Sequence, residues 1–292
     1  GFIGSNLADK LYVRGDNIII IDNFNDYYNP EIKHKNLVGK PYRIYEADIC
    51  DQSGLDKIFS ENKIDAVIHL AARAGVRPSL EQPLLYAETN LVGTVNVLET
   101  MRKHGCKKLL FASSSSVYGN CKAEKFSEDI PKTNPISPYG TTKLMCEEIA
   151  WTYSYLYNMN IIGFRFFTVY GPRMRPDLAI YKFAKMIKNG ETITKFGDGS
   201  NVRDYTYIDD ITDDIISGLN YNDTNFEIFN LGGGNPVSLN EMINTISQEL
   251  GLAPDIKQLP MQPGDVDKTI SDCRKACIAR SEERRVGKEC RS

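Results

Sequence analysis

The first 22 residues are the feature that most constrains how this chain can fold. Gly1 and Gly4 open a segment with apolar residues at helical spacing, which ends at Gly15 and is followed by four isoleucines and Asp22. A glycine turn, a helix, a buried strand and an acidic residue about 20 positions on form the second half of a dinucleotide-binding βαβ unit. The glycines would let the backbone approach a pyrophosphate, and Asp22 would accept both ribose hydroxyls of NAD. We therefore expect a Rossmann-type fold with NAD as cofactor; the alternative is a helix start with two packing glycines.

Both ends of the chain look incomplete. A Rossmann unit needs a first strand and an earlier glycine, and neither precedes Gly1. We expect an N-terminal truncation that removes the central strand and exposes core, because such strands are buried on both faces. Residues 280–292 are polar without an apolar face, and they resemble a translated sequencing-adapter DNA. We expect a non-native tail there, the alternative being a natural basic tail.

The order of strand-like and helix-like segments predicts the fold class. Strands and helices alternate up to residue 167, as in an α/β protein with a doubly wound parallel sheet. Beyond it glycines and prolines interrupt the pattern, and 197–200 carries a hairpin-like turn signal. We expect a Rossmann domain over 1–167 with 201–232. A smaller α/β substrate-binding domain is expected over 168–200 with 233–279.

Composition excludes several classes of function. The net charge of −3 provides no basic footprint, which argues against nucleic acid as a partner. No apolar run approaches the roughly 18 residues of a membrane span. The seven cysteines are dispersed, and the close pair Cys273 and Cys277 lacks further ligands for a metal site. His69 lies in an apolar run and is expected to be a core residue. Reduced thiols in a cytoplasmic protein without a metal are therefore expected.

Two motifs carry the chemistry. Tyr139 precedes Lys143 by four residues in a segment, 139–157, that we predict to be helical, so both side chains share a face. The ammonium would favour the phenolate and lower the tyrosine pKa from about 10, which suits a general base acting on a sugar or alcohol hydroxyl. The serine run 113–116 follows a predicted strand, 108–112, at the edge where open α/β sheets bind ligands. A solvated helix and a polar loop are the alternatives.

Together these residues resemble the nucleotide-sugar epimerase branch of the extended short-chain dehydrogenases/reductases, from residue 1 to about 276. The matching elements are Gly1 and Gly4, Asp22, Asp48-Ile49, the segments 69–76, 90–94 and 113–119, Tyr139 with Lys143, and 203–207. Within that branch, segments 22–28, 74–77, 168–172 and 175–177 are similar to UDP-glucuronate 4-epimerases.

This resemblance implies roles for named residues. Ser114, Tyr139 and Lys143 would be catalytic. The cofactor would be held by Gly1, Phe2, Ile3, Gly4, Asp22, Asn23, Asp48, Ile49, Leu70, Ala71, Ala72 and Asn90, together with Tyr139 and Lys143. The substrate would be held by Ser115, Ser116, Thr168 and Arg175 at a uronate carboxylate, Arg203 at the UDP phosphates and Asp265 at the uridine ribose. Arg73 stands where uronate epimerases often have glutamine, and Gln262 stands where UDP-glucose epimerases carry an arginine.

The activity implied is 4-epimerisation of UDP-glucuronate through a 4-keto sugar. UDP-glucose 4-epimerisation and UDP-glucuronate decarboxylation remain alternatives, because both begin with oxidation at C4. A non-catalytic NAD-binding module or an inactive fragment is the alternative of another class. Relatives in the family usually form homodimers through two helices from each subunit, here 87–104 and 139–157, although core packing explains the apolar stripes of these helices equally well.

Overall fold

The predicted glycine turn, helix and strand form at the start of the chain. The computed structural model describes residues 1–131, 133–261 and 266–280. Helix α1 (Phe2–Arg14) ends at Gly15, whose φ of 100° is left-handed and therefore suits glycine. Strand β1 (Ile19–Asp22) follows and ends on the predicted acidic residue. The helix, its end at Gly15 and the strand are confirmed, whereas Gly4 lies within the helix and β1 is only partly buried.

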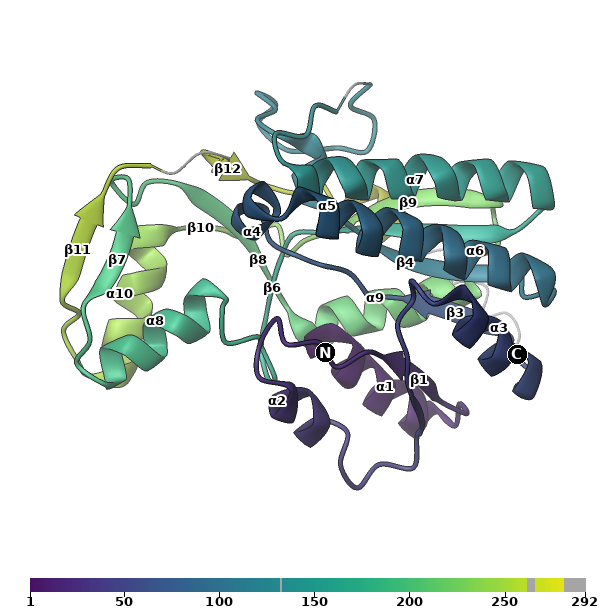
Figure 1. Cartoon of the computed structure of the whole chain (residues 1–292). Coiled ribbons are helices and arrows are strands. Elements are labelled where there is room, and N and C mark those ends of the chain that lie inside the picture. The colour runs from purple at the N-terminus through teal and green to yellow at the C-terminus, as the bar shows by residue number, and fades with distance from the viewer. Residues whose placement is uncertain (132, 262–265, 281–292) are drawn as a thin grey trace, which may run out of the picture.

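Parallel strands make up the main sheet. Strands β3 (Ala66–His69), β4 (Lys108–Ser114), β5 (Asn160–Phe166) and β9 (Phe226–Leu231) lie in the order β3-β4-β5-β9 (Figure 1). Strand β1 pairs in parallel with β2 (Arg43–Glu46). The α/β prediction with a parallel sheet is thus confirmed. No ladder joins β1 to β3 within the described residues, and a strand preceding residue 1 stays a prediction.

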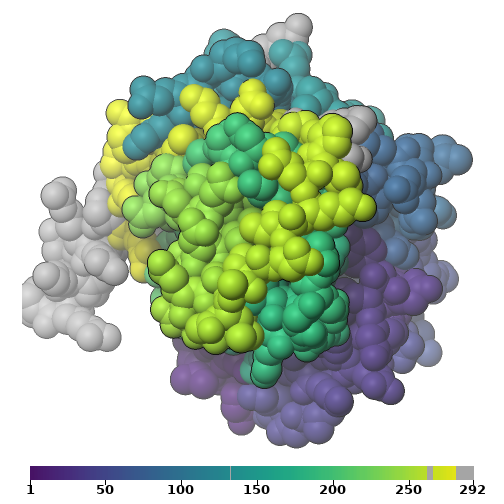
Figure 2. All heavy atoms as spheres, turned by 90° about the vertical axis from the view of Figure 1, so that its left-hand side faces the viewer, coloured from purple at the N-terminus to yellow at the C-terminus, as the bar shows by residue number. Residues whose placement is uncertain are grey.

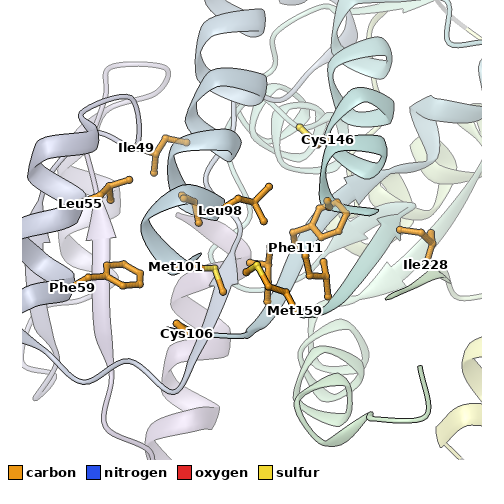
Figure 3. Close-up of a cluster of buried hydrophobic side chains, with 14 residues drawn as sticks. Ile49, Leu55, Phe59, Leu98, Met101, Cys106, Phe111, Cys146, Met159 and Ile228 are labelled. Atoms are coloured by element: carbon orange, nitrogen blue, oxygen red, sulfur yellow. The ribbon is translucent and has the colours of Figure 1, made fainter. Parts of the chain in front are cut away.

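Helices cover both faces of this sheet. Helices α3 (Gln52–Glu61), α6 (Gly93–Lys103) and α7 (Pro138–Tyr157) pack on one face, and α1 and α9 (Ile208–Asn220) pack on the other. Leu109 and Phe111 of β4 join the first core cluster, drawn in Figure 3, whereas Leu110 joins the second. A parallel strand that is apolar on both sides is buried on both faces, as the sequence pattern predicts.

The helix predicted over 87–104 forms, but its first six residues are π-helical. Short helices α4 (Val76–Glu81) and α5 (Pro83–Tyr86) lead into a π-helical turn, η1 (Ala87–Val92), and only then does α6 begin. The side chain of Asn90 in this turn bonds both the N–H and the C=O of Arg73, at 2.7 and 3.0 Å. This contact between distant segments accompanies the wider turn, and periodicity along the helix could not reveal it.

A smaller lobe lies at the left of Figure 1 and faces the viewer in Figure 2. It contains α8 (Ala179–Lys188), α10 (Leu239–Leu250) and a parallel pair of β7 (Ile193–Phe196) with β11 (Ile256–Leu259). Phe183, Ile193 and Ile243 are among the residues of its core. A capping box begins α10: the side chain of Ser238 accepts the N–H of Glu241, whose carboxylate accepts the N–H of Ser238.

The hairpin expected at residues 197–200 is wrong. Strand β8 (Val202–Tyr207) pairs with β6 (Thr168–Tyr170), β10 (Pro236–Ser238) and β12 (Lys268–Thr269), whereas β7 pairs with β11. The side chain of Asp198 accepts the N–H and the hydroxyl of Ser200. The turn residues therefore satisfy one another locally, and long-range pairing takes the two strands into different sheets.

A short helix, α2 (Pro30–Lys35), follows β1. Arg280 is described, whereas residues 281–292 of the expected tail and Asp265 lie outside the described ranges. The cysteines in those ranges are free thiols. None of the helices that the structure describes is long and apolar enough to cross a bilayer. The domain boundaries stay a prediction.

Candidate active site

The predicted cofactor residues gather where β1, β2 and β3 end. The Asp22 carboxylate accepts the N–H of Phe24 at 2.9 Å and lies 3.3 Å from the amino group of Gly1. A Cβ added at Gly4 would lie 3.8 Å from the side chain of Leu70, so the start of α1 lies beside the segment that follows β3. This is the edge of an α/β sheet at which a helix N-terminus and strand ends together receive a ligand.

Asp48 is fixed in its ionised form beside this edge. It accepts hydrogen bonds from the Asn23 side chain at 2.7 Å and from the Cys50 N–H at 2.8 Å. Burial alone would raise the pKa of Asp48, but these hydrogen bonds outweigh burial and lower its pKa below the usual value. Ile49 packs so closely that a Cβ added at Gly93 would lie 2.5 Å from it. The predicted pair Asp48-Ile49 is thereby held against the start of α6.

The side chain of Asn90 forms hydrogen bonds with two other segments of the protein. Besides its two bonds to the Arg73 backbone, its amide donates to the Thr142 hydroxyl at 3.1 Å, and the residue is buried. It therefore joins the segment after β3, where Leu70, Ala71 and Ala72 lie, to helix α7. A cofactor contact of Asn90 stays a prediction.

Helix α7 carries both residues of the tyrosine–lysine motif, as predicted. Ser137 caps the helix by accepting the Gly140 N–H at 3.1 Å, and Pro138 occupies the first turn. Lys143 is buried, and its ammonium donates to the Ala112 carbonyl of β4 at 2.8 Å. Tyr139 lies edge-on to Tyr86, with ring centroids 6.2 Å apart. The lysine is thus anchored to the strand that ends in the serine run.

The serine run turns sharply at the end of β4. Ser114, buried, accepts the Ser116 N–H at 3.1 Å and caps the 3₁₀ turn η2 (Ser115–Tyr118). A Cβ added at Gly140 would lie 2.6 Å from the Ser116 carbonyl oxygen and 3.0 Å from Pro135. Glycine beside Tyr139 therefore allows α7 to approach the backbone of the serine turn.

Gly140→Ala tests this close approach. Helix propensity alone would stabilise the protein by up to about 1 kcal/mol, but the clash with Ser116 is expected to dominate and destabilise it by about 2 kcal/mol. Moving α7 should also lower kcat about 10- to 100-fold. Thermal melts and turnover measure both effects. Thr141→Ala, at an exposed position on the same helix, is the control; equal behaviour of the two variants would contradict the contact.

The predicted substrate residues occupy several elements. Thr168 lies in β6 and pairs with Tyr205 of β8. Arg203 of β8 donates to the Val202 carbonyl at 2.9 Å. Arg175 forms a two-pronged ion pair with Asp177, at 3.0 and 2.9 Å. Burial alone would lower the pKa of Arg175, but this carboxylate raises it overall.

Sequence reasoning missed a pair of tyrosines in this region. The hydroxyls of Tyr27 and Tyr86 both donate to the Ala74 carbonyl at 2.9 Å. The guanidiniums of Arg73 and Arg175 lie 5.9 and 5.3 Å from the ring centroid of Tyr27. Tyr27 belongs to the segment used for the resemblance, but nothing in a single sequence links it to Tyr86, which itself touches Tyr139.

His69 is a core residue, as predicted. It is buried at the end of β3, with Nε2 3.0 Å from the Thr94 hydroxyl. Burial and the nearby Lys143 ammonium lower its pKa to about 3, so the ring is neutral. The hydrogen bond with Thr94 gives Nε2 of His69 a partner inside the fold.

Fold and site together define an α/β protein whose parallel strands end at an edge of the kind that binds dinucleotides. Beside that edge, the helix that carries Tyr139 and Lys143 packs on the serine turn. The sequence agrees with that description: residues 1–232 match the model of the NAD dependent epimerase/dehydratase family. The chain belongs to this family.

Three relatives show where in the family it lies. A UDP-glucuronate 4-epimerase of Thermodesulfobacterium geofontis is 42% identical over 281 residues, covering 94% of this chain and 86% of its own length. The structure of UDP-glucuronic acid 4-epimerase from Bacillus cereus, with UDP-glucuronic acid and NAD, matches with a TM-score of 0.89 at 33% identity, covering 96% of this chain and 90% of that one. A UDP-glucose 4-epimerase from Thermotoga maritima, solved with UDP-glucose, matches with a TM-score of 0.88 at 32% identity, covering 94% and 88%. The resemblance inferred from the motifs is confirmed.

Proposed function

We propose that this protein is an isomerase that converts UDP-glucuronate to UDP-galacturonate by NAD-dependent epimerisation at C4. One observation carries the proposal: α7, with Tyr139 and Lys143 one turn apart, packs directly on the serine turn that holds Ser114. The related enzymes that act on UDP-glucuronate support the substrate. The family and its NAD-bound structures support the cofactor.

The residues at the sheet edge fit NAD. The helix N-terminus at Gly1 and Phe2, beside Ile3 and Gly4, offers N–H groups to a pyrophosphate. Asp22 lies where a carboxylate would accept ribose hydroxyls. Next to it lie three further predicted cofactor residues, of which Asn23 and Asp48 are joined by a hydrogen bond and Ile49 follows directly. The rest of the cofactor would lie against four further residues: Leu70, Ala71, Ala72 and Asn90. When bound, NAD supplies the hydride acceptor that oxidation of a carbinol requires.

The chain's own residues would move the proton. Tyr139 as phenolate removes the proton of the sugar 4-hydroxyl and later returns it, while Ser114 shares that hydrogen bond. Lys143 is close by on the same helix face and stabilises the negative charge. Its anchor on Ala112 keeps the ammonium in place. The proposal needs no metal, because hydride transfer to NAD and proton transfer to Tyr139 suffice.

The substrate's anionic groups would be bound by polar and cationic side chains. Ser115, Ser116, Thr168 and Arg175 would hold the uronate carboxylate, Arg203 the UDP phosphates and Asp265 the uridine ribose. An arginine fork suits either anion because it pairs two oxygens at once. These assignments depend on the resemblance.

A second candidate, 4-epimerisation of UDP-glucose, draws support from one contact. The Arg175 guanidinium already pairs with Asp177 through two hydrogen bonds, so a substrate carboxylate would have to compete with a carboxylate of the protein. A neutral 6-hydroxyl would leave this ion pair intact. Decarboxylation of UDP-glucuronate is the third outcome to be distinguished.

Comparing kcat/KM for UDP-glucuronate and UDP-glucose tests the substrate. With NAD present we expect UDP-glucuronate to be preferred by at least about tenfold, because a site that pairs a carboxylate loses binding energy when that group is missing. Preference for UDP-glucose would favour the second candidate. Release of CO₂ with a UDP-pentose would identify a decarboxylase.

We also propose a cytoplasmic homodimer. Free thiols suit a reducing compartment. Exposed apolar side chains lie on η1 and α7: Val92, Met145, Trp151, Tyr155 and Leu156. Trp151 and Tyr155 stack with parallel rings at 5.5 Å. Exposed apolar side chains on neighbouring helical segments suit a second copy of the chain, and this supports the proposal of a two-helix interface.

Trp151→Glu should convert the dimer into a monomer. A charge placed inside the proposed interface would be desolvated without a partner, which is expected to weaken association by at least about 100-fold. Sedimentation velocity across a concentration series measures the change. Val38→Glu, at a highly exposed apolar residue elsewhere, should leave the mass unchanged. A monomeric wild type, or a dimeric Trp151→Glu, would contradict this interface.

A further inference from the structure

A chain of buried hydrogen bonds runs beneath the proposed catalytic residues. Ser113 donates to the Glu147 carboxylate, which forms a two-pronged ion pair with Arg165, at 2.9 and 2.7 Å. Arg165 also donates to the Tyr118 hydroxyl at 2.8 Å, and that hydroxyl donates to the side chain of Asn230 at 2.8 Å. We call these five residues the buried network. The sequence assigned no individual role to any of the five, although Ser113 belongs to the serine run predicted to lie at the ligand-binding edge.

The buried network places a full pair of charges in the interior. Glu147 is 4% exposed and Arg165 is 7% exposed. Burial alone would lower the pKa of Arg165, but the bonds and charge of Glu147 raise it, and the guanidinium stays protonated. Burial raises the pKa of Tyr118 to about 12, so its hydroxyl keeps the proton that it donates. Charges so buried are tolerated only where their partners are well oriented.

The buried network links the elements that carry the catalytic groups. Glu147 lies four residues after Lys143 and eight after Tyr139 on α7, so the three side chains follow one face of the helix. Ser113 immediately precedes Ser114 and pairs with Arg165 across β4 and β5. The ion pair therefore connects α7, which carries the base, to β5, and the hydrogen bond from Ser113 to Glu147 connects α7 to β4, the strand that carries Ser114.

Tyr118 extends the same connection to the serine turn. It closes η2, the turn that begins at Ser115, and the Arg165 guanidinium lies 4.8 Å from its ring centroid. Asn230 at the end of β9 holds the Tyr118 hydroxyl from the other side and donates to the Phe126 carbonyl at 2.8 Å. The guanidinium of Arg165 in β5 thus bonds side chains of α7 and η2, and β4 joins them through the hydrogen bond of Ser113 to Glu147.

We propose that Glu147 and Arg165 are positioning residues that set the distance between Tyr139 and Ser114. The inference depends on the proposed epimerase function and adds to it two residues that touch neither substrate nor cofactor. Two apolar side chains could fill the same volume, but they would let α7 slide along the sheet. Hydrogen bonds at fixed angles hold the helix in one register, and an error of about 1 Å at a reacting group costs about 100-fold in rate.

Two sets of variants separate positioning from stability. Glu147→Gln keeps the shape but removes the charge, and it should lower kcat about 10- to 100-fold with KM changed less than about threefold. The double variant Glu147→Leu with Arg165→Met removes both charges and should recover much of the melting temperature lost in either single variant. It should nevertheless keep the low kcat, because the orienting bonds are gone. Asp16→Asn, in the exposed Arg14–Asp16 pair, is the matched control.

A crystal structure of Glu147→Gln provides a readout that does not use the reaction. We expect the separation of Ser114 Oγ and the Tyr139 hydroxyl to differ from the wild type. If the wild type gives no product, the epimerase function fails, and this separation still decides the positioning role. An unchanged separation would overturn the proposal, as would a double variant that regains kcat together with its melting temperature.

Discussion

Tyr139→Phe is expected to lower kcat for epimerisation about 1000-fold. The substitution removes only the hydroxyl, which is the group that takes and returns the proton of the sugar 4-hydroxyl, and general base catalysis is worth about 10²- to 10⁴-fold. The ring can keep its edge-on contact with Tyr86, so the fold should be preserved. Turnover by NMR, with substrate dissociation constants measured by calorimetry, would show a loss in kcat with little change in binding.

Tyr181→Phe is the matched control for this loss. Tyr181 is a half-exposed tyrosine on α8, so removing its hydroxyl changes the same atom away from the predicted catalytic residues. We expect its kcat to stay within about twofold of the wild type. An undiminished rate for Tyr139→Phe would refute the role of Tyr139 as base, even if the protein remained an epimerase.

Asp204→Ala should produce the largest loss of stability. Asp204 is fully buried, and its carboxylate accepts the N–H groups of Gly233, Gly234 and Ser271, at 3.0, 3.2 and 3.0 Å, and the Ser271 hydroxyl. Alanine would leave these donors unpaired in the interior. Each unsatisfied group costs about 1–3 kcal/mol, so we expect a loss of about 4 kcal/mol, or about 10 °C in melting temperature.

The same substitution should weaken substrate binding. Asp204 follows Arg203 in β8 and ties this strand to the glycine run after β9 and to Ser271. Loosening β8 should move the predicted phosphate ligand and raise KM for the UDP-sugar. Asp223→Ala, at an exposed loop residue, should melt with the wild type. A melting temperature for Asp204→Ala within 2 °C of wild type would argue against this carboxylate as a structural anchor.

Local signals made much of the fold predictable. Ser238 and Glu241 form a capping box three residues apart, and the continuous apolar run 109–111 of β4 marks a strand buried on both faces. Tyr139 and Lys143 share a helix because the spacing of the motif and the helical period coincide. In each case the residues that decide the structure are near one another in sequence.

Contacts between distant segments were not predictable. The partner of β7 is β11, more than 60 residues away, and the turn at 197–200 suggests a nearer one. Glu147 looks like an ordinary helix-surface acid until the fold brings Arg165 against it. The bonds of the Asn90 side chain to Arg73 and Thr142 likewise could not be read from the sequence, and its expected contact with the cofactor stays a prediction. A sequence shows which residues are polar, but tertiary packing determines which polar groups meet.

Proton NMR of UDP-glucuronate incubated with the protein and NAD tests the central claim most directly. Inversion at C4 changes the coupling of the neighbouring ring protons, so substrate and product are resolved without derivatisation. The proposed function predicts UDP-galacturonate, approaching the same equilibrium mixture from either sugar. A folded, NAD-loaded protein that leaves UDP-glucuronate unchanged, or converts it to a UDP-pentose and CO₂, would contradict it.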